Sequence, residues 1–350
     1  QWGNICQKEL PGKNKSDRMW YTYQYDPHYH LFPTQVSDRF GYTSSMSEYN
    51  YRFGVPGRTT DINGQAMLTT VDGLGRVTAI RSPHELANGI PYTLSFAYHP
   101  QATVSSGAIT APAYAVTKHY DEANPGNDLE TVTFSDGFGR AIQVKKDGFI
   151  DNAEVSIVSG RVVYDAFGRA IRSYYPLVET NPANKYVFNA GVDNTAPPTV
   201  SQYDVLDRVV SITEPDGATT TTAYQLDEGL LKTTVTDAEN GQQATFTNGS
   251  GLTIRASQLS GPDGAITTQY AYDCINRPVR VTDTKGHQTV SVYDKLGRRT
   301  SVTHPASGTT RFSYDLAGNL VAKQTAELAK RGDSITYVYE CNRLKEIHYP

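Results

Sequence analysis

The sequence predicts an all-β protein of short strands and tight turns, and three observations lead to this prediction. Tyrosine is abundant, with 24 Tyr against 11 Phe, and tyrosine suits half-buried pleated surfaces. One short turn-like motif recurs along most of the chain. Long helices are hard to place: residues 325–330 have helical composition, but Arg331-Gly332-Asp333 ends that stretch at once.

Composition and charge favour a thin-layered protein and argue against a nucleic-acid partner and a membrane span. Hydrophobic residues make up 38% and charged residues 19% of the 350 positions, which is typical of a thin-layered protein rather than one with a thick core. The net charge of −4, without a long run of one sign, argues against a nucleic-acid partner. No stretch approaches the roughly eighteen apolar residues of a membrane span, and the N-terminal segment lacks a signal-peptide pattern.

The chain ends and the cysteines add two expectations. Because the sequence begins at Gln1 and stops at Pro350 inside a repeat, we expect a piece of a longer chain, with any targeting signal outside it. Cys6, Cys274 and Cys341 are odd in number and far apart, so they predict neither a disulfide framework nor a zinc site, and they leave the redox compartment open.

The recurring motif reads Tyr-Asp, two variable residues, Gly and Arg. Its clearest copies begin at Tyr164, Tyr293 and Tyr314, the last with Asn319 in place of Arg. Other copies lack the Tyr or replace the Gly by Asp207 or Asn276, residues that tolerate a left-handed backbone. The residues that we assign to these structural turns are Asp72, Gly75, Arg76, Asp136, Gly139, Arg140, Tyr164, Asp165, Gly168, Arg169, Tyr203, Asp204, Arg208, Tyr272, Asp273, Arg277, Tyr293, Asp294, Gly297, Arg298, Tyr314, Asp315 and Gly318.

Each copy is predicted to be a hairpin turn. The Asp side chain opens a type I turn, and the Gly takes the left-handed position that realigns the second strand. Strands are expected on both sides, as in residues 267–272 and 277–282, where Pro278 suggests a strand start. The spacing of 21 residues from Asp273 to Asp294 and from Asp294 to Asp315 leaves room for two strands and two turns per repeat.

Further turn signals close the repeats at their other end. They are Glu214-Pro215-Asp216-Gly217, Gly261-Pro262-Asp263-Gly264, Asp283-Thr284-Lys285-Gly286, His304-Pro305-Ala306-Ser307-Gly308 and Asp237-Ala238-Glu239-Asn240-Gly241.

Two regions are predicted. Residues 1–60 form a strand-bearing lead-in, in which Tyr21, Tyr23 and Tyr25 share one face of a strand. Residues 61–350 form the repeat region, incomplete at its C-terminal end. Ala196-Pro197-Pro198 is the best candidate for an internal loop.

These repeats resemble the YD repeats of the bacterial Rhs proteins. The likeness runs from about residue 61 to the end, where Tyr339-Glu340-Cys341-Asn342-Arg343-Leu344 resembles one more, shortened copy. The family includes the B and C components of insecticidal toxin complexes and, more distantly, the teneurin ectodomain. The resemblance implies a large spiralling sheet that forms part of a hollow shell.

The resemblance also implies partners and location. Neighbouring repeats of the same polypeptide and an enclosed C-terminal toxin lying beyond Pro350 are the expected partners. Secretion or toxin-complex components are further candidates, and the protein would be secreted or extracellular after delivery. The family's self-cleaving aspartyl site, marked Asp-Pro-x-Gly, is not matched, because Asp26-Pro27-His28-Tyr29 lacks the Gly and lies at the other end. No protease residue is carried over.

Fragments that imitate enzyme motifs have simpler explanations. His84-Glu85-Leu86-Ala87-Asn88 lacks the second His of a zinc protease helix, and Gly73-Leu74-Gly75 and Gly137-Phe138-Gly139 lack a third Gly and a βαβ unit. His28 and His30, with Asp26 as a loose third candidate, are too few ligands for a metal.

Turn formation also explains the remaining candidate catalytic residues, the aspartates and cysteines. Turn formation accounts for most aspartates, and Cys274 and Cys341 occupy matching turn positions without a partner His. We therefore predict no catalytic residue, no metal and no cofactor.

A binding module is the alternative function. Tyrosines on a solvent-facing sheet could stack on sugar rings, as in an extracellular adhesion or glycan-binding repeat. Tyrosines packed against neighbouring repeats would favour a shell, whereas outward clusters would favour glycan binding. The sequence does not assign the faces.

Overall fold

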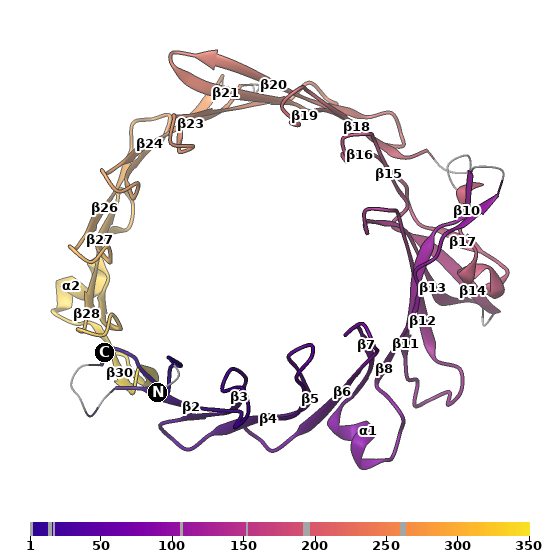
Figure 1. Ribbon diagram of the computed structural model, residues 1–350. Helices are drawn as coiled ribbons and strands as arrows, with labels where there is room; N and C mark the ends of the chain where they lie inside the picture. Colours follow the sequence, from indigo (N-terminus) through magenta and orange to yellow (C-terminus); the bar gives the residue numbers. More distant parts are fainter. Residues whose placement is uncertain are drawn as a thin grey trace. The chain divides into compact units, whose positions relative to one another are not determined.

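The chain is a succession of short strands joined by tight turns, as Figure 1 shows. This computed structural model describes residues 3–12, 16, 18–105, 108–151, 153–191, 197–259 and 264–350. Gly261-Pro262-Asp263 of one predicted turn and Ala196 of the predicted loop therefore lie outside the described residues. The chain divides into unit 1, Gln1–Cys6 with Thr22–Ala218, and unit 2, Gln7–Tyr21 with Thr219–Pro350.

Unit 1 contains two runs of strands in which nearly every strand pairs with its neighbour along the chain. The first run passes from β2 through β8 to β11–β14 and β17, and the second is β15, β16, β18 and β19; β9 pairs with β10 alone. Their bounds are β2 Trp20–Tyr25, which begins in unit 2, β3 Pro33–Asp38, β4 Thr43–Asn50, β5 Val55–Thr60, β6 Ala66–Val71, β7 Val77–Arg81, β8 Leu94–His99, β9 Thr103–Ser105, β10 Ala108–Ala111, β11 Ala113–His119, β12 Leu129–Ser135, β13 Ala141–Ile150, β14 Ala153–Ser159, β15 Val162–Tyr164, β16 Ala170–Ser173, β17 Leu177–Glu179, β18 Thr199–Tyr203 and β19 Val209–Thr213.

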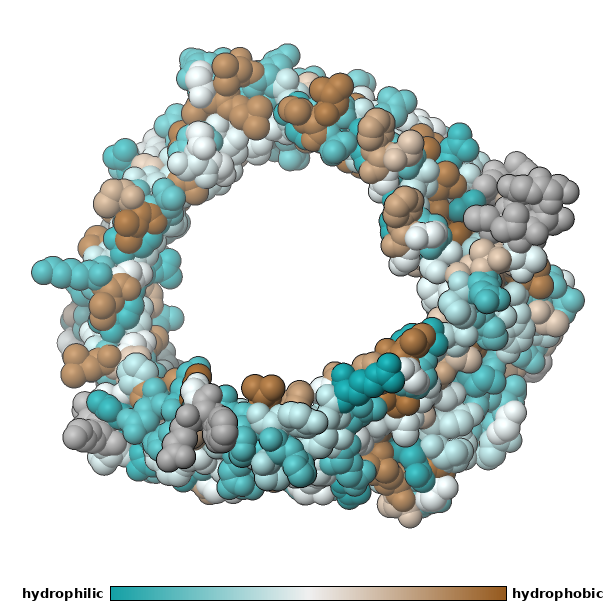
Figure 2. Space-filling model, viewed as in Figure 1, coloured by the Kyte–Doolittle hydropathy of each residue, from teal (hydrophilic) through white to brown (hydrophobic). Residues whose placement is uncertain are grey.

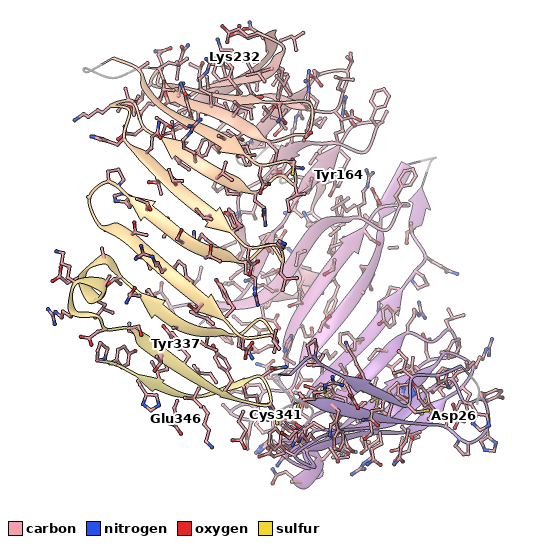
Figure 3. The ribbon with its side chains drawn as sticks, turned by 90° about the vertical axis from the view of Figure 1, so that its left-hand side faces the viewer. Asp26, Tyr164, Lys232, Tyr337, Cys341 and Glu346 are labelled. Atoms are coloured by element: carbon pink, nitrogen blue, oxygen red, sulfur yellow. The ribbon has the colours of Figure 1, made fainter. Side chains whose placement is uncertain are left out.

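Unit 2 contains one uninterrupted run, β20–β31, and the short β1. The bounds are β1 Gln7–Glu9, β20 Thr219–Asp227, β21 Leu230–Thr236, β22 Gln242–Thr247, β23 Thr253–Gln258, β24 Ile266–Tyr272, β25 Pro278–Thr282, β26 Gln288–Tyr293, β27 Arg299–His304, β28 Gly308–Tyr314, β29 Leu320–Gln324, β30 Ile335–Glu340 and β31 Arg343–His348. Figure 3 shows the later strands side by side, with Tyr337 on β30 and Glu346 on β31. The predicted two-strand, two-turn repeat is thus confirmed, including a strand that starts at Pro278.

Helical pieces are short and sit in connections. They are α1 Pro83–Ala87, the 3₁₀ turn η2 Pro182–Tyr186 and α2 Ala326–Arg331. The helix expected near residues 325–330 is confirmed as α2: Thr325 Oγ1 accepts the Leu328 N–H, and Gly332 ends the helix at φ 76°. Within the described part of the chain, no helix has the length and apolar character to cross a membrane.

Among the described residues of unit 1, one part has a covered core. Val116, Val132 and Phe134 are buried on β11 and β12, and Phe188 packs against them. Phe188 follows η2, which contacts β13 and β14. Residues 182–189 therefore cover this face of the sheet, and we call β11–β14 with residues 182–189 the covered region.

Elsewhere the sheet is a single layer with two unlike faces. Along β30, Ile335, Tyr337 and Tyr339 are half-buried, while Thr336 and Val338 are exposed, so burial alternates with period two. The directly paired Tyr337 and Ile347, or Tyr270 and Val281, share the tyrosine-bearing face. The low apolar content of the sequence thus corresponds to a sheet with little cover, and the all-β fold class is confirmed.

Candidate functional site

The recurring turn has one geometry in nearly every copy. Asp294 illustrates it: its Oδ1 accepts the N–H groups of Leu296 and Arg298, both at 2.9 Å. Its own N–H donates to the Arg298 carbonyl at 2.9 Å, and the Gly297 N–H donates to the Asp294 carbonyl at 3.0 Å. The strand register shifts by one residue beside Tyr293, as expected for a type I turn followed by a bulge.

The left-handed position is occupied in all seven copies. The residues and their φ angles are Gly75 82°, Gly139 76°, Gly168 85°, Asp207 60°, Asn276 66°, Gly297 83° and Gly318 91°. The sequence predicted this conformation, including the copies in which Asp or Asn replaces Gly.

The Arg that ends each copy clamps its own turn. Nε of Arg298 donates to Asp294 Oδ2 at 2.7 Å, and the same bond recurs at 2.6–2.8 Å in the other copies that have Arg. The pKa of Asp294 lies below its usual value because the Arg298 backbone N–H and guanidinium both donate to its carboxylate, although burial opposes the shift. This carboxylate is held ionised by structural partners rather than prepared for acid–base chemistry.

The same guanidinium reaches the next repeat. Arg298 lies over the Tyr314 ring, with Cζ 4.9 Å from the ring centroid, and donates to the Asp315 carbonyl at 2.8 Å. In the opposite direction along the chain, the Tyr314 hydroxyl donates to the Arg299 carbonyl at 3.0 Å. We call this pair of contacts, Arg to the next ring and Tyr to the carbonyl after the previous Arg, the Arg–Tyr link.

The Arg–Tyr link recurs in both units. The stacked pairs are Arg76–Tyr98 at 4.4 Å, Arg140–Tyr164 at 4.1 Å, Arg169–Tyr203 at 5.2 Å and Arg277–Tyr293 at 4.6 Å. The matching hydroxyl bonds run from Tyr98 to Val77, Tyr164 to Ala141, Tyr203 to Ala170 and Tyr293 to Pro278. In these four pairs and in Arg298–Tyr314, the Arg and the Tyr of the motif therefore join one repeat to the next.

The tip of each turn is apolar and exposed. The residue before the left-handed position, or its neighbour, is a large hydrophobic side chain: Leu74, Phe138, Phe167, Leu206, Ile275, Leu296 and Leu316. Phe138 is 87% exposed and Leu316 is 84% exposed. On the face that Figure 2 shows, hydrophobic side chains form small separate groups among hydrophilic ones.

Sequence reasoning missed two members of this pattern. Asp38 in the lead-in accepts the N–H groups of Phe40 and Tyr42, and Gly41 has φ 84°, the same turn without a YD signature. Asn248 forms it as well, and Tyr272 donates to Thr253 just beyond it. A search for Asp or Asn followed three residues later by Gly would have found both.

The Asp26 segment is a loop in which backbone N–H groups bind the Asp26 carboxylate. The buried Asp26 carboxylate accepts the N–H groups of His28, Tyr29, Leu31 and Phe32 at 2.6–3.1 Å. Burial would raise the pKa of Asp26, but these four bonds hold it well below its usual value. The described residues contain no group of three or more His, Cys, Asp or Glu arranged to hold a metal ion.

The other residues that imitate enzyme motifs lie in a short helix or are free cysteines. His84 is the second residue of the five-residue α1, and the neighbouring Glu85 carboxylate accepts a hydrogen bond from the Thr93 hydroxyl at 2.6 Å. All three cysteines are free thiols, with Cys6 and Cys274 exposed and Cys341 buried.

A charged cluster that the sequence did not reveal fastens the cover in unit 1. Lys145, fully buried, binds Glu179 at 2.8 Å and the Asn184 carbonyl at 3.0 Å. Lys185 binds both Glu130 and Asp147 at 2.8 Å. Because each buried carboxylate here has a cationic partner, the cluster is a structural network rather than a poised acid or base.

Electrostatics of Glu130 agree with this assignment. Burial would raise the pKa of Glu130, but hydrogen bonds from Lys118, Lys185 and Tyr186 lower it to about 2. Burial and the hydrogen bond to Glu130 raise the pKa of Tyr186 to about 12. Glu130 therefore stays ionised and Tyr186 stays neutral over the ordinary pH range.

Comparisons with known proteins agree with the repeat pattern. The family model RHS Repeat matches residues 293–329, and a model described as Domain of unknown function (DUF6443) matches residues 109–225. No curated protein matches the chain.

Solved structures share its fold. A crystal structure of TcdB2-TccC3 is 20% identical with a TM-score of 0.76, and the match covers 97% of this chain and 19% of that one. A structure of a Photorhabdus luminescens Tc holotoxin pore is 19% identical with a TM-score of 0.76, covering 97% of this chain and 21% of that one. This chain spans about a fifth of the length of those chains. The RHS repeat and the shared fold together confirm the predicted likeness to the Rhs/YD-repeat proteins and to toxin-complex components.

Proposed function

We propose that this chain is a structural wall segment of an Rhs-type β-shell. The Arg–Tyr link carries the proposal, because this recurring set of contacts joins one repeat to the next. A sheet of hairpins with little cover gains its stability from neighbouring strands, as repeat arrays do. Such a design suits a wall more than a catalytic cleft.

The proposed contents are a C-terminal toxin or effector segment beyond this chain, and the proposed partners are further repeats of the same polypeptide and toxin-complex components. One of the similar structures is described as TcdB2-TccC3 without its hypervariable C-terminal region, at 19% identity and a TM-score of 0.75. By this likeness we propose a secreted or extracellular, non-enzymatic protein in which residues 1–60 lead into the repeats of residues 61–350.

The tyrosines support a wall over a glycan-binding surface. Tyr164, Tyr203, Tyr293 and Tyr314 each lie beneath a guanidinium and donate their hydroxyl to backbone. Tyr25, in the lead-in, donates to the Ile5 carbonyl at 3.1 Å. The four repeat rings engaged in this way are not presented to a sugar, so these tyrosines favour the wall over the binding-module alternative.

Electron microscopy of the longest native protein that contains these residues tests the proposal. A hollow particle whose C-terminal tail resists added protease is expected, and a solid or extended particle with a digestible tail would overturn it. Arg277→Ala combined with Arg298→Ala weakens two consecutive links and should speed digestion of the tail. Leu296→Ser, which changes an exposed tip, is the matched control and should leave the tail protected.

A further inference from the structure

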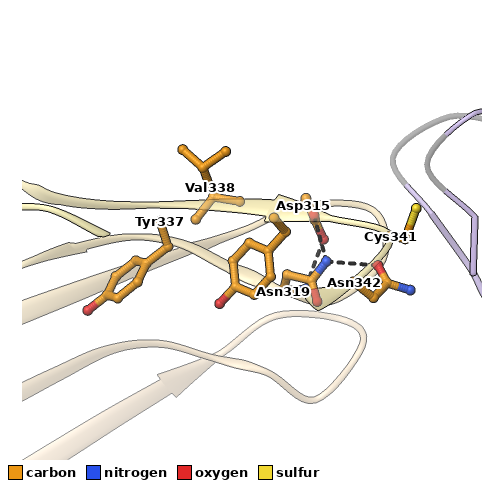
Figure 4. Close-up of a pocket in the computed structure, with 8 residues that line it drawn as sticks. Asp315, Asn319, Tyr337, Val338, Cys341 and Asn342 are labelled. Atoms are coloured by element: carbon orange, nitrogen blue, oxygen red, sulfur yellow. Dashed lines mark hydrogen bonds between the residues drawn. The ribbon is translucent and has the colours of Figure 1, made fainter. Parts of the chain in front are cut away.

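The repeat that ends at Asn319 lacks the Arg of the Arg–Tyr link. A pocket of about 350 Å³ lies at this place in unit 2, lined by Asp315, Asn319, Tyr337 and Tyr339 among others. Figure 4 shows Asp315, Asn319 and Asn342 gathered at the turn, with Tyr337 along the strand and Val338 on its opposite side. The volume is in the usual range for a small-ligand site.

The preceding repeats show what occupies this position when the motif is complete. Arg277 stacks on Tyr293 and donates to the Asp294 carbonyl at 3.3 Å, and Arg298 does the same to Tyr314 and Asp315. By the order of the repeats, Asn319 and Tyr339 form the next pair. The guanidinium groups of Arg277 and Arg298 fill this position in the two preceding repeats. In the repeat that ends at Asn319, the same position is therefore a cavity.

Asn319 replaces only part of what the Arg does. Its Nδ2 donates to Asp315 Oδ2 and to Asn342 Oδ1, both at 3.0 Å. The amide thus ties the turn to the last hairpin, which Asn342 fastens to the Pro11 carbonyl at 2.5 Å. The shorter side chain is neutral and brings no charge to the Tyr339 ring.

Two groups at the pocket consequently lack the partners that their equivalents have. Asp315 forms no ion pair within the described residues, whereas in the other six copies a guanidinium binds the equivalent carboxylate. In the same part of the chain the Tyr339 hydroxyl forms no hydrogen bond, whereas the Tyr314 hydroxyl has one at 3.0 Å. Burial, with the nearby Tyr337 and Asp315, raises the pKa of Tyr339, which agrees with a carboxylate close to this ring.

We propose that this pocket binds the guanidinium group of an arginine side chain supplied from outside residues 1–350. The Tyr339 ring offers a face for the planar cation, and the Asp315 carboxylate offers a charge partner. A guanidinium fits better than an ammonium, because it stacks flat on a ring while its N–H groups point to acceptors at the rim. The source is a segment of a longer native chain or a separate protein.

Saturation-transfer NMR with N-acetyl-L-arginine amide tests the site on the chain of residues 1–350. We expect saturable binding at one site and at least tenfold weaker binding of the lysine and citrulline analogues, which lack the planar shape or the charge. Absence of arginine binding, or equal binding of the lysine analogue, would overturn the proposal.

Matched variants locate the site. Asn319→Arg restores the motif and should abolish binding, while Ser313→Arg adds the same charge on the exposed face of β28 and should leave it unchanged. Binding that survives in Asn319→Arg would refute the assignment. Arg298→Asn should open an equivalent pocket beside Tyr314 and raise the number of arginine-binding sites from one to two. If this variant does not fold, the comparison of Asn319→Arg with Ser313→Arg still tests where the probe binds.

The same probe distinguishes the two sources of arginine. If a longer native chain fills the pocket itself, that longer protein should not bind the probe although residues 1–350 do. If a separate protein supplies the arginine, both should bind it. Failure to bind in residues 1–350 overturns this inference but leaves the wall proposal intact, because the latter depends on the completed links.

Discussion

The covered region of unit 1 and the single-layer strands β24–β29 of unit 2 are stabilised by different kinds of contact. In the covered region, residues 182–189 lie over the sheet, and Val132 and Phe134 are fully buried. In β24–β29 the described residues include none that is fully buried, and Arg–Tyr links recur at every second strand. Buried side chains stabilise the covered region, whereas repeated Arg–Tyr links stabilise strands β24–β29.

This difference teaches where each kind of substitution should matter. Burial concentrates stability in a few side chains, so a single truncation leaves a cavity that the surroundings fill only partly. The links distribute stability over many half-exposed contacts, each of modest value. Damage to the covered region should therefore cost more per residue than damage to the links.

The largest effect is expected for Phe134→Ala in the covered region. Removing this fully buried ring should lower the free energy of unfolding by about 3–5 kcal/mol. Urea unfolding followed by circular dichroism measures it. Phe138→Ala, in the same hairpin but 87% exposed, is the matched control and should change the value by less than about 0.5 kcal/mol. Equal losses would show that the cover does not protect this core.

A pH-dependent effect is expected next, from Glu130. Its folded pKa of about 2 lies below its usual value of 4.5, so its stabilising contribution is complete above about pH 4.5 and is lost as the pH falls toward 2. The urea midpoint of the native chain should therefore fall more steeply over this window than that of Glu130→Gln. Glu239→Gln, at an exposed turn, should follow the native curve, and parallel curves for all three would contradict the assigned network.

The sequence was most informative where structure is local. The turn, its left-handed position and the strands beside it depend on residues within five positions of one another, and all could be predicted from Asp, Gly and alternation. The Arg was recognised as part of the motif, but its contact with the Tyr of the next repeat was not. That contact joins Arg277 to Tyr293 or Arg169 to Tyr203 across variable loops, and nothing in the spacing specifies it.

The covered region was beyond sequence reasoning for a related reason. The sequence pattern predicted no role for residues 182–189 or for Lys145, Glu130 and Lys185. Their burial depends on pairing between residues 34–55 positions apart, such as Lys145 with Glu179 and Lys185 with Glu130. Charged residues are rarely buried unless paired, and pairing at such distance leaves no periodic trace.

Within the single-layer region, Gly297→Val tests the turn itself. Gly297 has φ 83°, a conformation that a β-branched residue adopts poorly, so we expect a loss of roughly 1–3 kcal/mol in the free energy of unfolding. Gly73→Val is the control, because Gly73 has no left-handed backbone and open space around the position of a Cβ. The same urea assay measures both. A neutral result at Gly297 would refute the role of the left-handed position.

The smallest effect compares a complete link with the incomplete one. Tyr314→Phe keeps the ring beneath Arg298 but removes the hydroxyl that donates to the Arg299 carbonyl at 3.0 Å, so a loss of about 0.5–1 kcal/mol is expected. Tyr339→Phe removes a hydroxyl without such a bond among the described residues and should change the free energy of unfolding by less than about 0.3 kcal/mol. In the Asn319→Arg background the two substitutions should become more alike, since the restored guanidinium draws the Tyr339 ring into a complete link. If Tyr339→Phe instead costs as much as Tyr314→Phe in the native chain, the last link is already closed and the pocket beside Asn319 is not a missing guanidinium position.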